Sequence, residues 1–107
     1  MIYLDNSATT KPCKEAVEAM TAALTQGWAN PSALYGFGIE AAHTLRTARQ
    51  QVAAALGAEH DRVFFTSGGT EADNWAMYGT IKRLGKRGKH IVTTAIEHHA
   101  VLNCMKD

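Results

Sequence analysis

The chain has 107 residues, a hydrophobic share of 46% and a formal net charge of +1, which fits one small domain or part of a larger one. Its acidic and basic residues are nearly balanced and interspersed, which argues against a surface for nucleic acid or a charged membrane. No apolar run approaches the roughly 18 residues of a membrane span, and the N-terminus lacks the pattern of a signal peptide. Cys13 and Cys104 lack a CxxC spacing. We therefore expect free thiols in a cytoplasmic protein.

The first residues predict an extended segment, a loop and then a helix. Residues 2–4 are apolar and are expected to be extended, and the small polar residues 5–10 are expected to form a loop. A helix is predicted over residues 12–25, because Pro12 suits a first turn and apolar residues recur at spacings of three and four. Gly27 is suited to cap the end of this helix.

A second helix is predicted after a break at residues 28–32. The residue before a proline disfavours the helical region, so Asn30 is expected to be extended ahead of Pro31. From Gly36 or Gly38 to Leu56 the apolar residues form one stripe, and Gly57 is placed to end the helix. The first half of the chain is therefore expected to be helical.

The second half predicts a strand over residues 62–66, a helix over residues 70–84 and a strand over residues 90–94. Both strands are continuously apolar, as buried parallel strands are, so the pattern predicts the α/β class. Two strands do not make a stable sheet that is covered on both faces. We therefore expect an incomplete parallel sheet with flanking helices, and a chain that is the first part of a larger domain.

The junction between the first predicted strand and the helix after it has the composition of a phosphate-binding turn. The first N–H groups of a helix have no partner inside it, and the helix dipole favours an anion there. Gly68 and Gly69 would let a phosphate approach the backbone, and Ser67 and Thr70 would add hydroxyl donors. The spacing fits neither a Walker A loop nor G-x-G-x-x-G. The alternative is a plain helix cap, in which Thr70 and Asp73 form a capping box.

A pair of histidines follows the second predicted strand. Ligands of open α/β sheets collect beyond the carboxyl ends of the strands, so residues 67–70 and 96–99 could face one ligand. The imidazole of His98 or His99 could stack on a planar ring or exchange protons near neutral pH. The alternative is a pair of surface histidines. A metal site is not predicted, because adjacent side chains diverge.

Four segments, taken in order, resemble motifs of the cysteine desulfurases, pyridoxal 5′-phosphate enzymes of the class V aminotransferase group with fold type I. The segments are Tyr3-Leu4-Asp5-Asn6-Ser7-Ala8-Thr9-Thr10, Asn30-Pro31-Ser32-Ala33-Leu34-Tyr35 with Gly38, Phe65-Thr66-Ser67-Gly68-Gly69-Thr70-Glu71-Ala72-Asp73-Asn74, and Glu97-His98-His99-Ala100-Val101. The match covers nearly the whole chain. It implies that residues 1–107 form an N-terminal arm plus the first part of the large cofactor-binding domain.

The resemblance implies a role for each matching site residue. Gly69 and Thr70 would bind the phosphate of pyridoxal 5′-phosphate, through backbone N–H groups and the threonine hydroxyl. His98 would stack on the pyridine ring and act as a catalytic residue that helps to move protons, whereas His99 falls on a variable position and receives no role. Tyr35 stands where the family usually has a histidine. The resemblance implies no metal.

The resemblance also implies the reaction. Sulfur from L-cysteine would pass to a catalytic cysteine, leaving L-alanine and an enzyme persulfide that supplies acceptor proteins for iron–sulfur cluster or thiocofactor assembly. Neither Cys13 nor Cys104 matches that cysteine, and no lysine lies in the Schiff-base motif. We therefore expect the 107-residue chain to be inactive alone, and the intact protein to be a homodimer. The alternatives are a selenocysteine lyase-type relative and a non-catalytic phosphate-binding module.

Two expectations about the sheet conflict. Consecutive strands are often neighbours, so residues 62–66 would pair with residues 90–94 in a right-handed parallel unit. In the resembled fold, strands from later in the chain separate these two.

Overall fold

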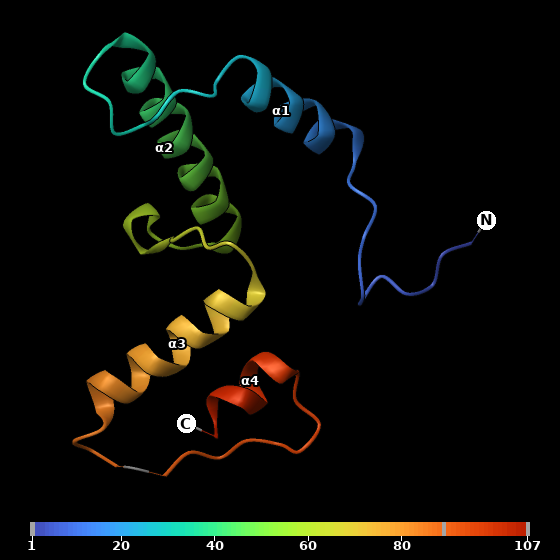
Figure 1. Cartoon of the computed structure of the whole chain (residues 1–107), viewed down its shortest axis with the longest axis vertical. Helices are drawn as coiled ribbons and strands as arrows, with labels where there is room; N and C mark the ends of the chain where they lie inside the picture. The colour runs from blue at the N-terminus through green and yellow to red at the C-terminus, as the bar shows by residue number, and fades with distance from the viewer. Residues whose placement is uncertain (1, 89, 107) are drawn as a thin grey trace. The chain divides into compact units, whose positions relative to one another are not determined.

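The computed structural model describes residues 2–88 and 90–106 (Figure 1). Among these residues, the elements in chain order are α1 (Lys14–Thr25), α2 (Gly36–Leu56), the short 3₁₀ helix η1 (His60–Arg62), α3 (Gly69–Leu84) and α4 (His99–Cys104). The chain divides into two compact units, Met1–Val63 and Phe64–Asp107. The helices of the described residues are all too short or too polar to cross a membrane.

Helix α1 begins later than the sequence predicts. Pro12 lies outside the helix, because Cys13 is extended, with φ −70° and ψ 162°, and is the N-cap. At the other end, the N–H group of Gly27 donates to the carbonyl groups of Ala22 and Ala23 at 3.3 and 3.1 Å. This bonding confirms the predicted place of Gly27 at the helix end. All of α1 is described, and none of its residues is buried.

Helix α2 has the bounds that the sequence predicts. Gly57 ends it in the left-handed conformation, with φ 64° and ψ 31°, which glycine adopts because it has no Cβ. A Cβ at Gly38 would overlap the carbonyl oxygen of Ala33, so close packing explains the second glycine of the first turn. The Nε–H group of Arg49 donates to the carbonyl oxygen of Val63 at 3.0 Å, which ties the end of the first unit to α2.

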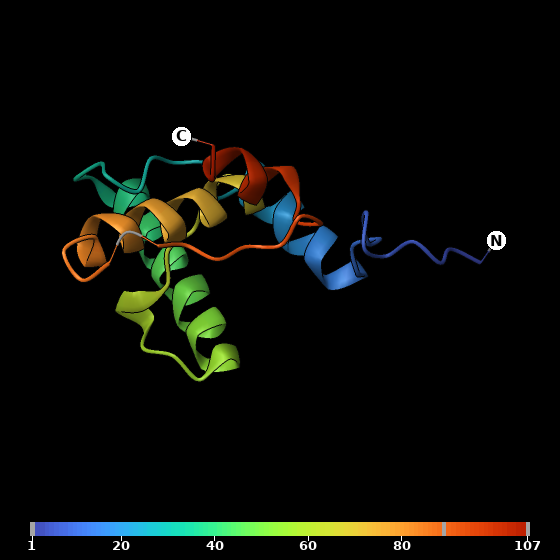
Figure 2. The same ribbon diagram turned by 90° about the horizontal axis from the view of Figure 1, so that it is seen from below.

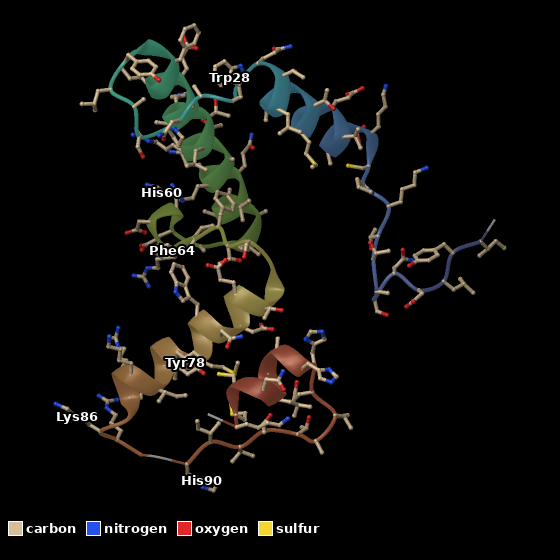
Figure 3. All side chains as sticks on the ribbon, viewed as in Figure 1. Trp28, His60, Phe64, Tyr78, Lys86 and His90 are labelled. Atoms are coloured by element: carbon tan, nitrogen blue, oxygen red, sulfur yellow. The ribbon has the colours of Figure 1, made fainter. Side chains whose placement is uncertain are left out.

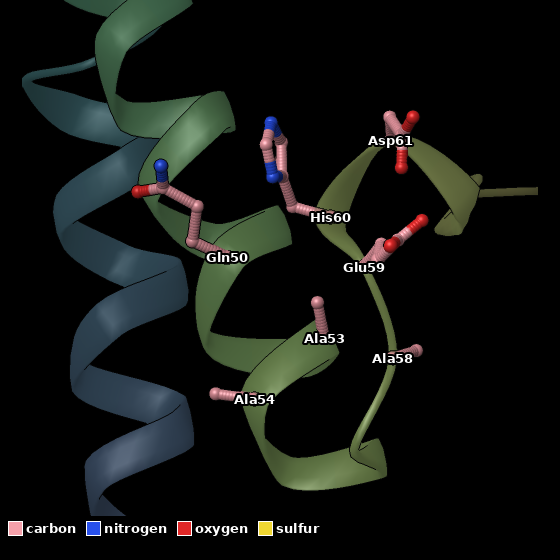
Figure 4. Close-up of a pocket in the computed structure, with 7 residues that line it drawn as sticks. All are labelled: Gln50, Ala53, Ala54, Ala58, Glu59, His60 and Asp61. Atoms are coloured by element: carbon pink, nitrogen blue, oxygen red, sulfur yellow. The ribbon is translucent and has the colours of Figure 1, made fainter.

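The chain after α2 folds back on that helix through η1. Ala53 on α2 is 2% exposed and is the most buried of the described apolar residues. Figure 4 shows Gln50, Ala53 and Ala54 on α2 across from residues 58–61. These residues line an open cavity of about 560 Å³. This contact gives the first unit its small core.

The described residues contain no β-strand, which corrects the prediction of strands over residues 62–66 and 90–94. Arg62 belongs to η1, and its N–H group donates to the carbonyl oxygen of Glu59 at 3.0 Å. Val63 is extended, with φ −100° and ψ 121°, but an extended segment becomes a strand when a second one satisfies its backbone groups. Residues 64–66 and 90–94, as far as they are described, do not pair with each other. The prediction that consecutive strands pair is therefore wrong.

In the second unit, the short helix α4 lies against α3 (Figures 1 and 2). Ala100 and Cys104 are each 7% exposed and are four residues apart, so they lie on one face of α4. The start of this unit is held to α3 by Phe64 (labelled in Figure 3), whose ring meets that of Trp75 edge to face with centroids 6.0 Å apart. The bounds of α3 agree with the predicted helix to within one residue.

Candidate functional site

A cavity of about 360 Å³ lies between α3 and α4 in the second unit. The residues that line it come from the first turns of α3 and from α4: Thr70, Asn74, His98, His99, Ala100, Asn103 and Cys104. Thr70 and His98, two of the three predicted site residues, therefore meet at one cavity. Gly69, the third, precedes Thr70 as the first residue of α3.

The backbone at the start of α3 is open. Gly68 is the N-cap, with extended φ 165° and ψ 179°, and no side chain among the described residues caps the helix. The first helical bond runs from the N–H group of Ala72 to the carbonyl oxygen of Gly68 at 3.1 Å, so the N–H groups of Gly69 and Thr70 have no acceptor within the helix. A Cβ at Gly68 or Gly69 would meet no atom of the described chain within 4 Å. The protein's own packing does not require glycine here, and the space fits an anion that approaches the backbone.

Glu71 organises the turn that precedes α3. Its carboxylate accepts from the N–H group of Ser67 at 2.6 Å and from the Ser67 hydroxyl at 2.7 Å. The Ser67 hydroxyl therefore donates to Glu71, and its donation to a phosphate stays a prediction. The predicted capping box of Thr70 and Asp73 is wrong, because the N-cap is Gly68. Glu71 instead reaches back to the N–H group of Ser67, the residue before the N-cap, which resembles the contact that the acidic residue of a capping box makes.

This contact makes a pH-dependent contribution to stability. The pKa of Glu71 is lowered, first by the backbone N–H group of Ser67 and then by its hydroxyl, against a smaller opposing effect of burial. Because the folded-state pKa lies below the unfolded one, ionised Glu71 stabilises the fold above the ordinary carboxyl range. That contribution is lost as the pH falls through the lowered folded value.

We therefore expect wild type to have a higher thermal midpoint than Glu71→Gln at neutral pH, because the neutral amide is a weaker acceptor for Ser67. The difference should shrink in acid, where Glu71 becomes protonated. Differential scanning calorimetry of both proteins from neutral pH to about one unit below the ordinary glutamate pKa checks this. A difference that stays constant or grows in acid would contradict it.

His98 is the N-cap of α4. Its backbone is extended, with φ −61° and ψ 149°, and its Nδ1 accepts from the N–H group of Ala100 at 3.1 Å. Since a neutral imidazole carries one proton, this bond assigns the proton to Nε2. The ring of His98 meets the ring of His99 at 87°, with centroids 6.2 Å apart. With this geometry, the two imidazoles cannot both lie flat on one planar ligand.

Asn74 is a site residue that the sequence reasoning missed. Its side-chain Nδ2 donates to the carbonyl oxygen of Thr70 at 2.8 Å and lies 3.4 Å from the carbonyl oxygen of Ala100 on α4. Asparagine is a poor helix former, so its place inside the predicted helix was one signal, and its place at the end of the motif over residues 65–74 was another. The partner on α4 is 26 residues away, and sequence spacing does not reveal such a contact.

The remaining candidate residues are placed as follows. Cys104 is buried at the cavity and Cys13 is exposed, and both are free thiols. Within the described residues, no group of three His, Cys, Asp or Glu side chains could hold a metal ion. Tyr35 is the N-cap of α2 in the first unit.

Comparison with known proteins agrees with the motifs. Residues 2–107 match the family model described as aminotransferase class V. The chain belongs to this family. It is 51% identical over 102 residues to "Cysteine desulfurase IscS" of Methanosarcina thermophila, covering 95% of this chain and 25% of that one. It is 47% identical over 102 residues to "Cysteine desulfurase IscS" of Clostridium botulinum (strain Kyoto / Type A2), and this match covers 95% of this chain and 26% of that one.

This class V aminotransferase segment also has a solved structural neighbour. A chain described as a NifS-like protein superposes with a TM-score of 0.89 at 40% identity, covering 98% of this chain and 29% of that chain. The chain spans about a quarter of the length of the curated relatives that it matches. The expected family is confirmed, and the structural neighbour supports the expected fold, although the described residues contain no strand of the expected sheet.

Proposed function

We propose that residues 1–107 form the N-terminal arm and the first part of the large cofactor-binding domain of a cysteine desulfurase. The full-length protein would take sulfur from L-cysteine, with pyridoxal 5′-phosphate as cofactor, and leave L-alanine and an enzyme persulfide for iron–sulfur cluster or thiocofactor assembly. The observation that carries the proposal is that Thr70 and His98 line one cavity beside the open start of α3. The two relatives named cysteine desulfurase support the same reaction.

Gly69 and Thr70 are the residues proposed to hold the cofactor phosphate. Their N–H groups have no acceptor within the helix, and the positive end of the α3 dipole favours a dianion there. A side chain at Gly69 would enter open space, so the absence of one leaves room for phosphate oxygens. The hydroxyl of Thr70 lies at the same cavity and can add a third donor.

His98 is proposed to lie on the cofactor ring and to act as the catalytic residue of this segment. Its Nδ1 is engaged by the N–H group of Ala100, so the neutral imidazole presents an Nε2–H donor on its other side. His99 is nearly perpendicular to it and would meet the same ring by its edge. The cofactor, when bound, supplies the electron sink for bond breaking at the substrate, and His98 positions the ring and exchanges a proton at Nε2.

The proposal extends to the setting of the full-length protein. Neither Cys13 nor Cys104 is proposed as the sulfur-accepting nucleophile, and none of the lysines here is proposed to hold the cofactor, so the 107-residue chain is proposed to be inactive alone. The likeness to the family supports a homodimer in the cytoplasm that passes sulfur to acceptor proteins.

The test is to incubate the full-length protein with pyridoxal 5′-phosphate, L-cysteine and a thiol reductant, and to measure alanine and sulfide together. We expect both products in equal amounts, dependent on the cofactor, and none from residues 1–107 alone. If the protein bound pyridoxal 5′-phosphate but formed no alanine, the result would indicate a non-catalytic phosphate-binding module. Turnover of L-selenocysteine but not of L-cysteine would indicate a selenocysteine lyase-type enzyme. Either result would reject the proposal.

A further inference from the structure

Asn74 makes contacts with both elements that line the candidate site. It lies in the second turn of α3 and is partly buried. Its Nδ2 is 2.8 Å from the carbonyl oxygen of Thr70 and 3.4 Å from the carbonyl oxygen of Ala100. Both partners are acceptors, which assigns the amide nitrogen to this side. An amide NH₂ group has two protons, so one can be directed at each carbonyl.

The peptide groups of Ala100 are engaged on both sides. Its carbonyl oxygen faces Asn74, and its N–H group donates to Nδ1 of His98 at 3.1 Å. Ala100 is 7% exposed, so water competes little for these groups. A continuous chain of polar contacts therefore runs from Thr70 through Asn74 and Ala100 to the imidazole of His98. The four residues line the same cavity.

We infer that Asn74 is a positioning residue, which fixes the distance between the backbone at Thr70 and the imidazole of His98. This inference rests on the proposed function, in which Thr70 meets the phosphate and His98 meets the ring of one rigid ligand. A ligand of fixed length needs both contacts at a fixed separation, because small misplacements of a positioned group are costly. Asn74 touches neither the phosphate nor the ring in this account. It acts through Thr70 and Ala100.

Replacing Asn74 with aspartate or with alanine separates the effect of added charge from the effect of losing the two contacts. Asn74→Asp keeps the shape but turns two donors into acceptors facing two carbonyl oxygens, and Asn74→Ala removes both contacts without adding charge. Asn103→Asp is the matched control, because Asn103 is exposed at the same cavity on α4. It adds the same charge without facing these carbonyl groups.

The experiment uses the full-length protein in two states. In the cofactor-free state, nitrogen-15 spectra of selectively labelled histidine report the tautomer of His98, which is assigned by its absence in His98→Asn. We expect wild type and Asn103→Asp to show one Nε2–H tautomer, and both Asn74 variants to show a mixture. With pyridoxal 5′-phosphate, Asn74→Ala should raise the dissociation constant by about 10-fold. The induced circular dichroism per bound cofactor should fall by half or more in this variant, because the pyridine ring would no longer be held in one orientation.

Each outcome decides the inference. If wild type binds the cofactor and Asn74→Ala leaves the His98 spectrum and the induced circular dichroism unchanged, the inference is overturned. Equal effects of Asn103→Asp and Asn74→Asp would also overturn it, because charge alone would then explain them. If wild type binds no cofactor, the proposed function fails, and the cofactor-free spectra still decide the role of Asn74: an altered tautomer in its variants supports it and an unaltered one rejects it. Should Asn74→Ala fail to fold, the isosteric Asn74→Asp gives the same comparison.

Discussion

Replacing His98 with asparagine is expected to lower the rate of alanine formation by the full-length protein by about 10²- to 10⁴-fold, the range typical of a lost acid–base group. Asparagine is a strong N-cap, and its side-chain oxygen can accept from the N–H group of Ala100 as Nδ1 of His98 does. Helix α4 should therefore remain, while the ring and its proton are lost. Steady-state alanine production, measured beside the thermal midpoint, checks both parts.

Two further variants complete this experiment. His98→Ala loses the cap as well as the imidazole. Its rate of alanine formation should match that of His98→Asn, and its free energy of unfolding should be about 1 kcal/mol lower than that of His98→Asn. His99→Asn removes the neighbouring imidazole of the same cavity and should keep most of the activity. The assignment of His98 would be contradicted if His98→Asn stayed fully active, or if His99→Asn lost as much.

The second large effect is expected at Gly69, where stability and cofactor binding should change in opposite directions. Gly69→Ala should raise the dissociation constant for pyridoxal 5′-phosphate by about 10- to 100-fold, because a methyl group would keep phosphate oxygens from the backbone and cost a bond to a charged group. The same change should stabilise the fold by about 0.4–1 kcal/mol, since Gly69 is already helical and a Cβ there meets no described atom within 4 Å. Fluorescence titration and thermal unfolding measure the two effects.

Gly79 provides the control for this prediction. It lies on the same helix, and a Cβ there also meets no described atom within 4 Å. Gly79→Ala should therefore stabilise the fold in the same way and leave cofactor binding unchanged. Unaltered binding by Gly69→Ala, or equal weakening by both variants, would show that the open backbone at α3 is not the phosphate site.

Helices α1, α2 and α3 could be predicted because their signals are local, whereas neither η1 nor α4 was predicted from the sequence. Gly57 has the left-handed backbone that ends α2, and the turn at Gly68 and Gly69 separates an extended segment from α3. Such signals depend on a few neighbouring residues, so spacing and composition suffice to find them. The one clear error of position is at Pro12, where an extended Cys13 delays the start of α1.

The strands could not be predicted in the same way, because a strand depends on its partner. Residues 64–66 and 90–94 contain apolar pairs, Phe64-Phe65 and Ile91-Val92, but an apolar sequence does not reveal a hydrogen-bonding partner. Val92 is 85% exposed and Phe64 is 66% exposed, so these segments keep the composition of buried strands without the burial. The composition typical of strands was recognised, but the predicted pairing of the two segments was wrong.

The site was predicted in outline and missed in its connections. The composition of the two turns indicated Thr70 and the histidine pair, the motif likeness selected His98 from that pair, and the structure brings Thr70 and His98 to one cavity. The contact of the Ser67 hydroxyl with Glu71 was not predicted from the sequence. Asn74 was missed because its partner on α4 is distant in sequence. Histidine is not among the preferred N-caps, so the capping role of His98 also left no clear signal.

The most direct measurement is a crystal structure of the full-length protein with pyridoxal 5′-phosphate. We expect the phosphate within hydrogen-bonding distance of the N–H groups of Gly69 and Thr70, and the imidazole of His98 flat against the pyridine ring with its Nδ1 still bonded to Ala100. A phosphate held elsewhere on the protein, or a ring stacked on His99 with His98 turned away, would contradict the account.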